Sequence, residues 1–215
     1  VEGFVNAASK HKKLRIHTGT HFHPFHSEEG RMDQLRWFDH WLKGIDTGIM
    51  DEPPVKLEIR TGGSPERYPF RTENEWPLAR TQWTRMYLRT DREPSSDAQA
   101  AEGELTKTAP PKAARLTYTA SGVTKAGVAS GSSLSTTHGN VGRSGVSFET
   151  PAMAEDTEIT GPMAMKLWVS STSEDMDIFI TLRNIDANGK DIPEVGQHGQ
   201  PVPCVTKGWL RASHR

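Results

Sequence analysis

Cysteine is almost missing from this sequence, which contains one, Cys204, in 215 residues. A single cysteine excludes an intrachain disulfide and a zinc site built from cysteines alone. Long apolar runs are missing too: none approaches the length of a membrane span, and no signal peptide is visible in the chain, which starts at Val1. These absences argue against a membrane protein and against a disulfide scaffold. We expect a cytoplasmic location, although a missing signal peptide carries little weight in a chain that starts at Val1.

An excess of charge of one sign is also missing. Lysine and arginine together number 26 against 27 acidic residues, which gives a formal net charge of -1. Neither a nucleic-acid partner nor a membrane-surface partner is indicated, because such proteins carry basic clusters. A hydrophobic fraction of 34% predicts a modest core with long loops. A homo-oligomer stays open.

A Gly-x-Ser-x-Gly motif, the nucleophile elbow of α/β-hydrolases, occurs nowhere in the chain. The nearest match, Gly142-Arg143-Ser144-Gly145, lies in a stretch rich in Gly, Ser and Thr, which reads as a surface loop. If the chain belongs to a serine hydrolase, the nucleophile must lie on sequence outside it.

Histidine, by contrast, is concentrated. Four of the nine histidines, His17, His21, His23 and His26, fall within residues 17–26. We refer to these ten residues as the histidine loop. Residues 14–16 before it predict a short strand.

The residues after the histidine loop predict a helix over 27–43. Ser27 can cap its first turn, and Leu35, Phe38 and Leu42 recur at helical spacing. Gly44 is a C-cap candidate. Such a strand–loop–helix unit is where α/β enzymes place chemistry, at the carboxyl end of a strand.

Beyond Pro53-Pro54 the pattern becomes β. Alternating or β-rich segments predict strands at residues 55–60, 83–89, 115–119, 163–169 and 177–183. Asn188-Gly189 predicts a tight turn, and residues 91–112 and 120–145 read as long loops. Many short strands with long loops predict a β-sandwich of the jelly-roll kind.

Two kinds of site could use the histidine loop. His21, His23 and Glu28 resemble half of a cupin metal site, but Pro24 breaks a central strand and a helix follows at once. The other kind is a catalytic histidine on the loop between a late strand and a late helix, as in α/β-hydrolases. A third interpretation is a non-catalytic carbohydrate-binding sandwich that uses exposed tryptophans.

A series of short motifs runs along the chain, at residues 14–21, 34–44, 54–59, 75–81, 86–88, 146–150, 159–162, 167–171, 175–179 and 208–215. In their order and spacing these motifs resemble the X-Pro dipeptidyl-peptidase/cocaine esterase (CocE/NonD) group of serine hydrolases. The resemblance implies an α/β-hydrolase C-terminal segment in residues 1–50, followed by an all-β, galactose-binding-like jelly roll in residues 51–215.

The resemblance also implies an activity and one site residue. Laying residues 14–16 on the family strand puts His21 at the catalytic histidine, with His23 as second choice. The expected reaction is cleavage of an acyl ester or an X-Pro dipeptide amide bond by a Ser-His-Asp triad, with no cofactor and no metal. The serine and the acidic member are expected upstream of this chain, which alone should be inactive.

Other residues of the region are expected to serve the fold. Trp37 and Trp41 should pack between the helix and the sheet, and Asp33 and Asp39 should face solvent. Cys204, between Pro203 and Val205, should be an inert buried thiol.

Overall fold

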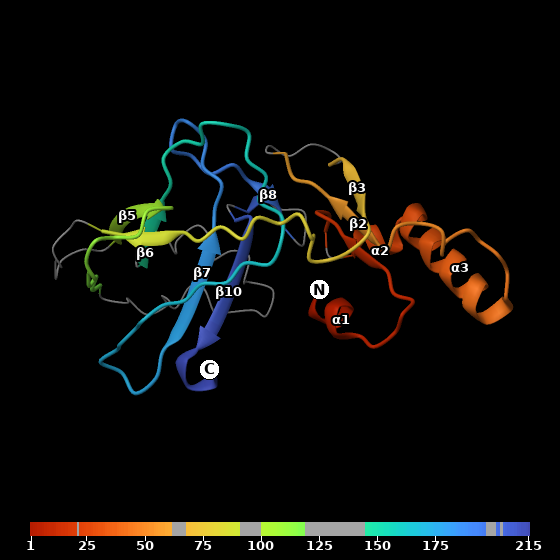
Figure 1. The fold of residues 1–215 in the computed structure, drawn as a ribbon, viewed down its shortest axis with the longest axis horizontal. Coiled ribbons are helices and arrows are strands. Elements are labelled where there is room, and N and C mark those ends of the chain that lie inside the picture. The colour runs from red at the N-terminus through yellow and green to blue at the C-terminus, as the bar shows by residue number, and fades with distance from the viewer. Residues whose placement is uncertain (21, 62–67, 91–99, 119–144, 197–200, 203) are drawn as a thin grey trace. The chain divides into compact units, whose positions relative to one another are not determined.

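The computed structural model describes residues 1–20, 22–61, 68–90, 100–118, 145–196, 201–202 and 204–215 (Figure 1). The chain forms two compact units, which are described separately. The first consists of Val1–Thr81, Gly161–Asn184 and Asp191–Arg215, and the second of Gln82–Thr160 and Ile185–Lys190.

The N-terminal part of the first unit contains three helices and three strands. They are α1 (Glu2–Asn6), β1 (Leu14–Ile16), α2 (His23–His26), α3 (Glu28–Lys43), β2 (Val55–Glu58) and β3 (Phe70–Glu73). The sheet order is β1-β2-β3, with β1 parallel and β3 antiparallel to β2. Since β1 and β2 are parallel, the helical connection between them is a β-α-β crossover. The domain boundary expected near residue 50 falls in this connection and stays a prediction.

Helix α3, the long orange coil in Figure 1, has the ends that its sequence predicts. The Ser27 side chain accepts a hydrogen bond from the Gly30 backbone N–H at 3.1 Å. Glu28 and Glu29 occupy the first turn, where negative charge is favourable. Gly44 ends the helix in the left-handed conformation, with φ of 68°. The predicted helix is therefore confirmed.

The core of the first unit gathers around β2. Val55 and Leu57 are fully buried, whereas Lys56 and Glu58, on the alternate positions, are half-buried. Cys204 is buried as expected. The remaining buried apolar residues among those described are Ile49, Tyr68 and Leu78. This core is small, so much of the apolar surface of the chain stays exposed.

A buried ionic cluster joins distant parts of the first unit. Glu194 is 2% exposed, and its Oε2 lies 3.3 Å from the Nε of Arg60. The Tyr68 hydroxyl donates to the same oxygen at 3.3 Å, and Arg60 also donates to the Val205 carbonyl at 2.7 Å. A buried carboxylate requires such partners, because burying an unpaired charge is costly. The cluster thus ties the end of β2 to the C-terminal strands.

The C-terminal part of the first unit forms two ribbons. Strand β7 (Asp177–Leu182) pairs antiparallel with β10 (Thr206–Arg211), and the two blue arrows lie side by side in Figure 1. Strand β8 (Glu194–Val195) pairs with β9 (Pro201–Val202), and the 3-10 helix η4 (Ala212–His214) follows β10. Every residue of β10 is exposed.

In its described residues, the second unit contains one three-stranded sheet. Its order is β4 (Tyr87–Arg89), β5 (Ala100–Thr106) and β6 (Gly145–Glu149). Strand β5 is antiparallel to β4 and parallel to β6. The predicted turn at Asn188-Gly189 is present: Gly189 has φ of 76°, and the Asp186 N–H donates to the Lys190 carbonyl at 2.8 Å.

Three expectations about the β part need correction. Residues 163–169 form no strand, and neither do the described residues 115–118. Strand β5 lies inside residues 91–112, which were expected to be loop. Its partners, β4 and β6, lie outside that segment. A strand forms only where a neighbouring strand supplies hydrogen bonds to its backbone, so the segment alone did not reveal it. Residues 120–144 of the second expected loop lie outside the described residues.

The described strands form small separate sheets of two and three strands. Regular structure beyond residue 50 is β in character, as predicted, apart from η4. The jelly-roll arrangement itself stays a prediction. Within the described ranges, no helix combines the length and apolarity needed to cross a membrane.

Candidate functional site

The histidine loop starts where β1 and β2 end together. Ile16 pairs with Leu57, so His17 and Glu58 follow at the same carboxyl edge of the parallel pair. The Glu58 Oε2 accepts two hydrogen bonds from Thr18, one from the backbone N–H at 2.7 Å and one from Oγ1 at 2.6 Å. Thr18 is 9% exposed, so both bonds are sheltered from water.

His17 stands beside this contact. Burial lowers the pKa of His17 below its ordinary value of 6.5. The Glu58 carboxylate opposes this shift, and the Arg15 guanidinium adds to it. The His17 Nδ1 is buried and has no hydrogen-bond partner among the described residues. A neutral imidazole is therefore favoured at the start of the histidine loop.

The other end of the histidine loop is fixed by Pro24. The Gly19 backbone approaches this proline so closely that a Cβ on Gly19 would lie 3.0 Å from the Pro24 Cγ. The Ser27 hydroxyl donates to the Pro24 carbonyl at 2.9 Å, which links α2 to the cap of α3. The loop is thus held at Thr18 by Glu58 and at Pro24 by Gly19 and Ser27.

The structure describes only some of the predicted site residues. His21 lies outside the described residues. His23 is the first residue of α2, and the structure describes nothing of its side chain. Glu28, the third member of the cupin-like set, is exposed and pairs with Arg31. No group of three or more His, Cys, Asp or Glu able to hold a metal occurs among the described residues.

Sequence reasoning missed Glu58 and gave His17 no role. Alternation in residues 55–60 predicted the strand that ends at Glu58, but that pattern carries no information on its neighbour. The contact with Thr18 spans 40 residues and depends on the β1–β2 register. If the strands at residues 14–16 and 55–58 had been assumed to pair in parallel, the residues that follow the first strand would have been expected to lie near Glu58.

Helix α3 attaches to the sheet through charged side chains. The Arg15 guanidinium on β1 contacts Asp33 at 2.8 Å and Glu29 at 3.1 Å. Lys56 on β2 contacts Glu29 at 2.8 Å. The contact from Lys56, together with that from Arg15, lowers the pKa of the Glu29 carboxyl. Asp33 therefore binds Arg15 and does not simply face solvent, which corrects the expectation.

The opposite side of α3 carries large apolar side chains that are exposed in the described structure, although the His11 ring lies 5.0 Å from that of Trp41. Its exposed large side chains are Met32 (43%), Leu35 (47%), Phe38 (53%), Trp41 (44%) and Leu42 (77%). We call these five residues the α3 apolar face. The expectation that Trp41 packs between helix and sheet is wrong in this structure, although Trp37 is half-buried and its ring lies 5.9 Å from that of Trp41.

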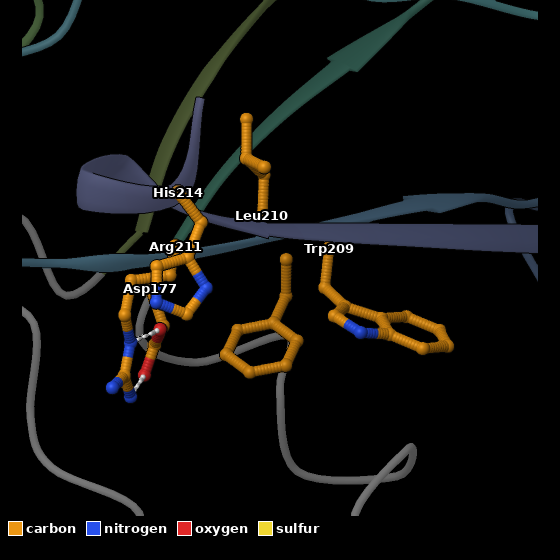
Figure 2. A pocket seen from close by; sticks show the side chains of 6 residues that line it. Asp177, Trp209, Leu210, Arg211 and His214 are labelled. Atoms are coloured by element: carbon orange, nitrogen blue, oxygen red, sulfur yellow. Dashed lines mark hydrogen bonds and ion pairs between the residues drawn. The ribbon is translucent and has the colours of Figure 1, made fainter.

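A second candidate lies at the end of the β7–β10 ribbon (Figure 2). It is a hollow of about 290 Å³ lined by Asp177, Phe179, Trp209, Leu210, Arg211 and His214. Figure 2 shows Arg211 joined to Asp177 by two bonds, which measure 2.8 Å and 3.0 Å. These bonds lower the pKa of the Asp177 carboxyl.

The charges of this hollow satisfy one another. Arg211 neutralises Asp177, and the hydroxyl of Ser213 donates to the neighbouring Asp175 carboxylate at 2.7 Å. Trp209 and Phe179, directly opposite each other on the two strands, are 66% and 65% exposed. The hollow therefore offers aromatic surface beside a closed ion pair, with the His214 imidazole as a further polar group in its lining.

Comparison with known protein families gives a match over most of the chain. Residues 47–215 match the model of the X-Pro dipeptidyl-peptidase C-terminal non-catalytic domain. Two crystal structures of a CocE/NonD family hydrolase from Staphylococcus aureus have a similar fold, with a TM-score of 0.66 and 24% identity. That similarity covers 100% of this chain and 33% of the hydrolase.

Sequence relatives agree with this match. Proteins from Mycobacterium bovis and Mycobacterium tuberculosis that carry the name serine esterase are each 27% identical over 181 residues. The similarity covers 84% of this chain and 26% of each esterase. A Bacillus cereus protein named as an Xaa-Pro dipeptidyl-peptidase is 34% identical over 79 residues, 36% of this chain and 12% of that protein. The chain thus spans about a quarter of the mycobacterial relatives.

Proposed function

The chain belongs to the family of the X-Pro dipeptidyl-peptidase C-terminal non-catalytic domain, and on that premise we propose that it is the C-terminal part of a serine hydrolase. The proposed substrates are acyl esters or X-Pro dipeptide amides, in line with the names of its relatives. The proposal includes a cytoplasmic location and a jelly-roll arrangement of the β part.

The α3 apolar face is the observation that carries this proposal. An amphipathic helix normally buries its apolar stripe, yet here the charged side of α3 binds β1 and β2 while the apolar side is exposed among the described residues. Exposed contiguous apolar surface of this kind marks an interface. The rest of an α/β-hydrolase domain, carried on further sequence, would cover it.

The proposed role of the histidine loop is to supply the general base. His21 would accept the proton of a serine hydroxyl as that oxygen attacks the substrate carbonyl, and would return it to the leaving group. An acidic residue elsewhere in the protein would orient the imidazole. General-base catalysis contributes a rate factor of about 10² to 10⁴. Without a nucleophile of its own, the 215-residue chain should be inactive alone.

The β part would carry no proton transfer. In this proposal it caps the catalytic domain and shapes the pocket that receives the acyl group or the dipeptide. The description of the family as non-catalytic supports that division of labour. The cupin-like and carbohydrate-binding alternatives find no support in the family or in the relatives.

The test uses a longer protein that carries this chain. We expect it to cleave p-nitrophenyl esters or X-Pro-p-nitroanilides, to react with a fluorophosphonate probe, and to lose at least 10²-fold in kcat on His21→Ala. His23→Ala is the matched control and should retain most activity. Full activity of His21→Ala, or turnover by the 215-residue chain that His21→Ala abolishes, would contradict the assignment.

A further inference from the structure

We propose that Arg60, Tyr68 and Glu194 form a latch that holds the C-terminal ribbons of the first unit on its N-terminal sheet, β1-β2-β3, and that can open without unfolding that sheet. We call these three residues the Glu194 latch. Such a latch is a conformational device of the fold, and it does not depend on the proposed function.

The parts that the latch joins belong to separate sheets. Among the described strands, the β7–β10 and β8–β9 ribbons share no ladder with β1-β2-β3. Every residue of β10 is exposed, and β7 alternates between exposed and half-buried residues. Two-stranded ribbons are only marginally stable on their own. The two ribbons therefore depend on contacts outside their own ladders to stay in place.

Both donors of the latch come from one end of the N-terminal sheet. Arg60 is the second residue after β2, and Tyr68 lies two residues before β3. The Ile59 N–H donates to the Pro69 carbonyl at 3.0 Å, which keeps these two segments side by side. The Arg60 Nε and the Tyr68 hydroxyl each lie 3.3 Å from the same oxygen, Glu194 Oε2 on β8. Two side chains of the N-terminal sheet thus converge on one atom of the C-terminal part.

A second contact of Arg60 extends the latch to the other ribbon. Its Nη1 donates to the Val205 carbonyl at 2.7 Å, and the Val205 N–H donates to the Leu182 carbonyl at 2.8 Å. Leu182 is the last residue of β7, and β10 begins at Thr206. One guanidinium therefore binds β8 through Glu194 and the β7–β10 ribbon through Val205.

The burial of Glu194 makes the closed state depend on its partners. Glu194 is 2% exposed, whereas the Arg60 side chain is 29% exposed. Burial raises the pKa of Tyr68 and the Glu194 carboxylate adds to this, so the phenol keeps the proton that it donates. Removing one partner of a buried ion pair leaves an uncompensated charge. Opening the latch would return that charge to water, so loss of Arg60 should favour the open form.

Cys204 can report whether the latch is closed. It is the only cysteine of the chain, it is buried, and it directly precedes Val205. Because Arg60 holds the Val205 carbonyl, loss of this contact frees the backbone beside the thiol. The rate at which iodoacetamide alkylates Cys204 in the folded 215-residue chain therefore measures how often the latch opens.

Arg60→Met should speed alkylation of Cys204 about 100-fold or more, because it removes one partner of a buried pair. Tyr68→Phe removes only a hydroxyl and should speed alkylation about 3- to 10-fold, so it tests the latch even if Arg60→Met does not fold. Arg211→Met is the matched control, since it breaks an ion pair with Asp177 in which the side chains are 50% and 45% exposed. It should stay within about 3-fold of the parent chain.

Hydrogen exchange separates opening of the latch from unfolding of the whole unit. In Arg60→Met and Tyr68→Phe, the amides of β7 and β10 should exchange faster by a factor similar to that of alkylation. The protected amides of β1 and β2 should stay within about 3-fold of the parent chain. Equal acceleration in all four strands would mean that the unit unfolds as a whole, and the latch would be overturned. An unchanged alkylation rate in either variant would overturn it as well.

Discussion

The Cα of Gly30 lies against the carbonyl oxygen of Pro24, so close that a Cβ on Gly30 would be 1.9 Å from that oxygen. Gly30 is also the buried residue of α3 and donates its N–H to the Ser27 cap. The contact therefore joins the end of the histidine loop to the first turn of α3, and it needs a residue without a side chain.

Gly30→Ala should destabilise the chain even though alanine is the better helix former. Overpacking typically costs about 1–3 kcal/mol, which outweighs the roughly 1 kcal/mol that alanine gains in a helix interior. The free energy of unfolding in urea measures the difference. Gly208→Ala on β10 is the matched control, because a Cβ there meets no heavy atom within 4 Å. An unchanged or higher free energy of unfolding for Gly30→Ala would show that α2 can move away from the added methyl group without loss of stability.

A second prediction concerns Glu73, a 9% exposed carboxylate at the end of β3. Hydrogen bonding from Arg80 lowers the pKa of Glu73 below its ordinary value of 4.5, and Arg71 acts in the same direction. A lowered folded-state pKa stabilises the fold above the unfolded value, and this stabilisation is lost as the pH falls through the folded-state pKa.

Arg80→Met should therefore reduce the free energy of unfolding at pH 7, and its difference from the parent chain should shrink below pH 4.5. Urea titrations at pH 7 and pH 3 measure this. Arg85→Met, which removes the same charge from another exposed arginine, is the control and should stay within about 0.5 kcal/mol of the parent. A loss for Arg80→Met that is equal at both pH values would argue against the ion pair as its cause.

The α3 apolar face gives a third prediction. Leu42 is 77% exposed, so Leu42→Gln should change the unfolding free energy of the 215-residue chain by no more than about 0.5 kcal/mol. In a longer protein whose hydrolase domain covers α3, the same change should cost about 2–5 kcal/mol, as expected for a buried leucine.

Lys43→Gln on the same helix is the control for Leu42, because the Lys43 side chain is 63% exposed, pairs with Asp39 and is not one of the residues of the α3 apolar face. It should be neutral in both proteins. If Leu42→Gln is also neutral in the longer protein, the apolar face has another occupant or none, and the main support for the proposed function disappears.

These features differ in how far the sequence foretells them. The ends of α3 follow from local chemistry: Ser27 caps one end and Gly44 takes a left-handed conformation at the other. Local patterns also place the core of β2 and the turn at Asn188-Gly189. In each of these the deciding atoms lie within a few residues of one another.

Features that depend on contacts between segments far apart in the sequence were harder to predict. Residues 163–169 alternate like a strand, yet Met163, Met165 and Leu167 are exposed and form no ladder. The Thr18–Glu58 contact likewise depends on a register between strands 40 residues apart. Family resemblance pointed to His21, and that assignment stays a prediction; the contact between Thr18 and Glu58 came only from the structure.

The last prediction concerns His17 at the start of the histidine loop. Burial and Arg15 lower the pKa of His17 below 6.5, and the opposing effect of Glu58 is smaller than that of burial. The unfolded chain therefore binds a proton at higher pH than the folded chain. The stabilisation is complete above pH 6.5 and is lost as the pH falls through the folded-state pKa.

His17→Asn removes this titration while keeping a polar side chain of similar shape. The unfolding free energy of the parent chain should exceed that of His17→Asn by more at pH 7.5 than at pH 5, and an NMR titration of the His17 imidazole should give a midpoint below 6.5. A midpoint above 6.5 would mean that the Glu58 carboxylate, not burial, dominates. Glu58 would then be engaged with a protonated His17 as well as with Thr18, and Glu58→Gln should lower that midpoint.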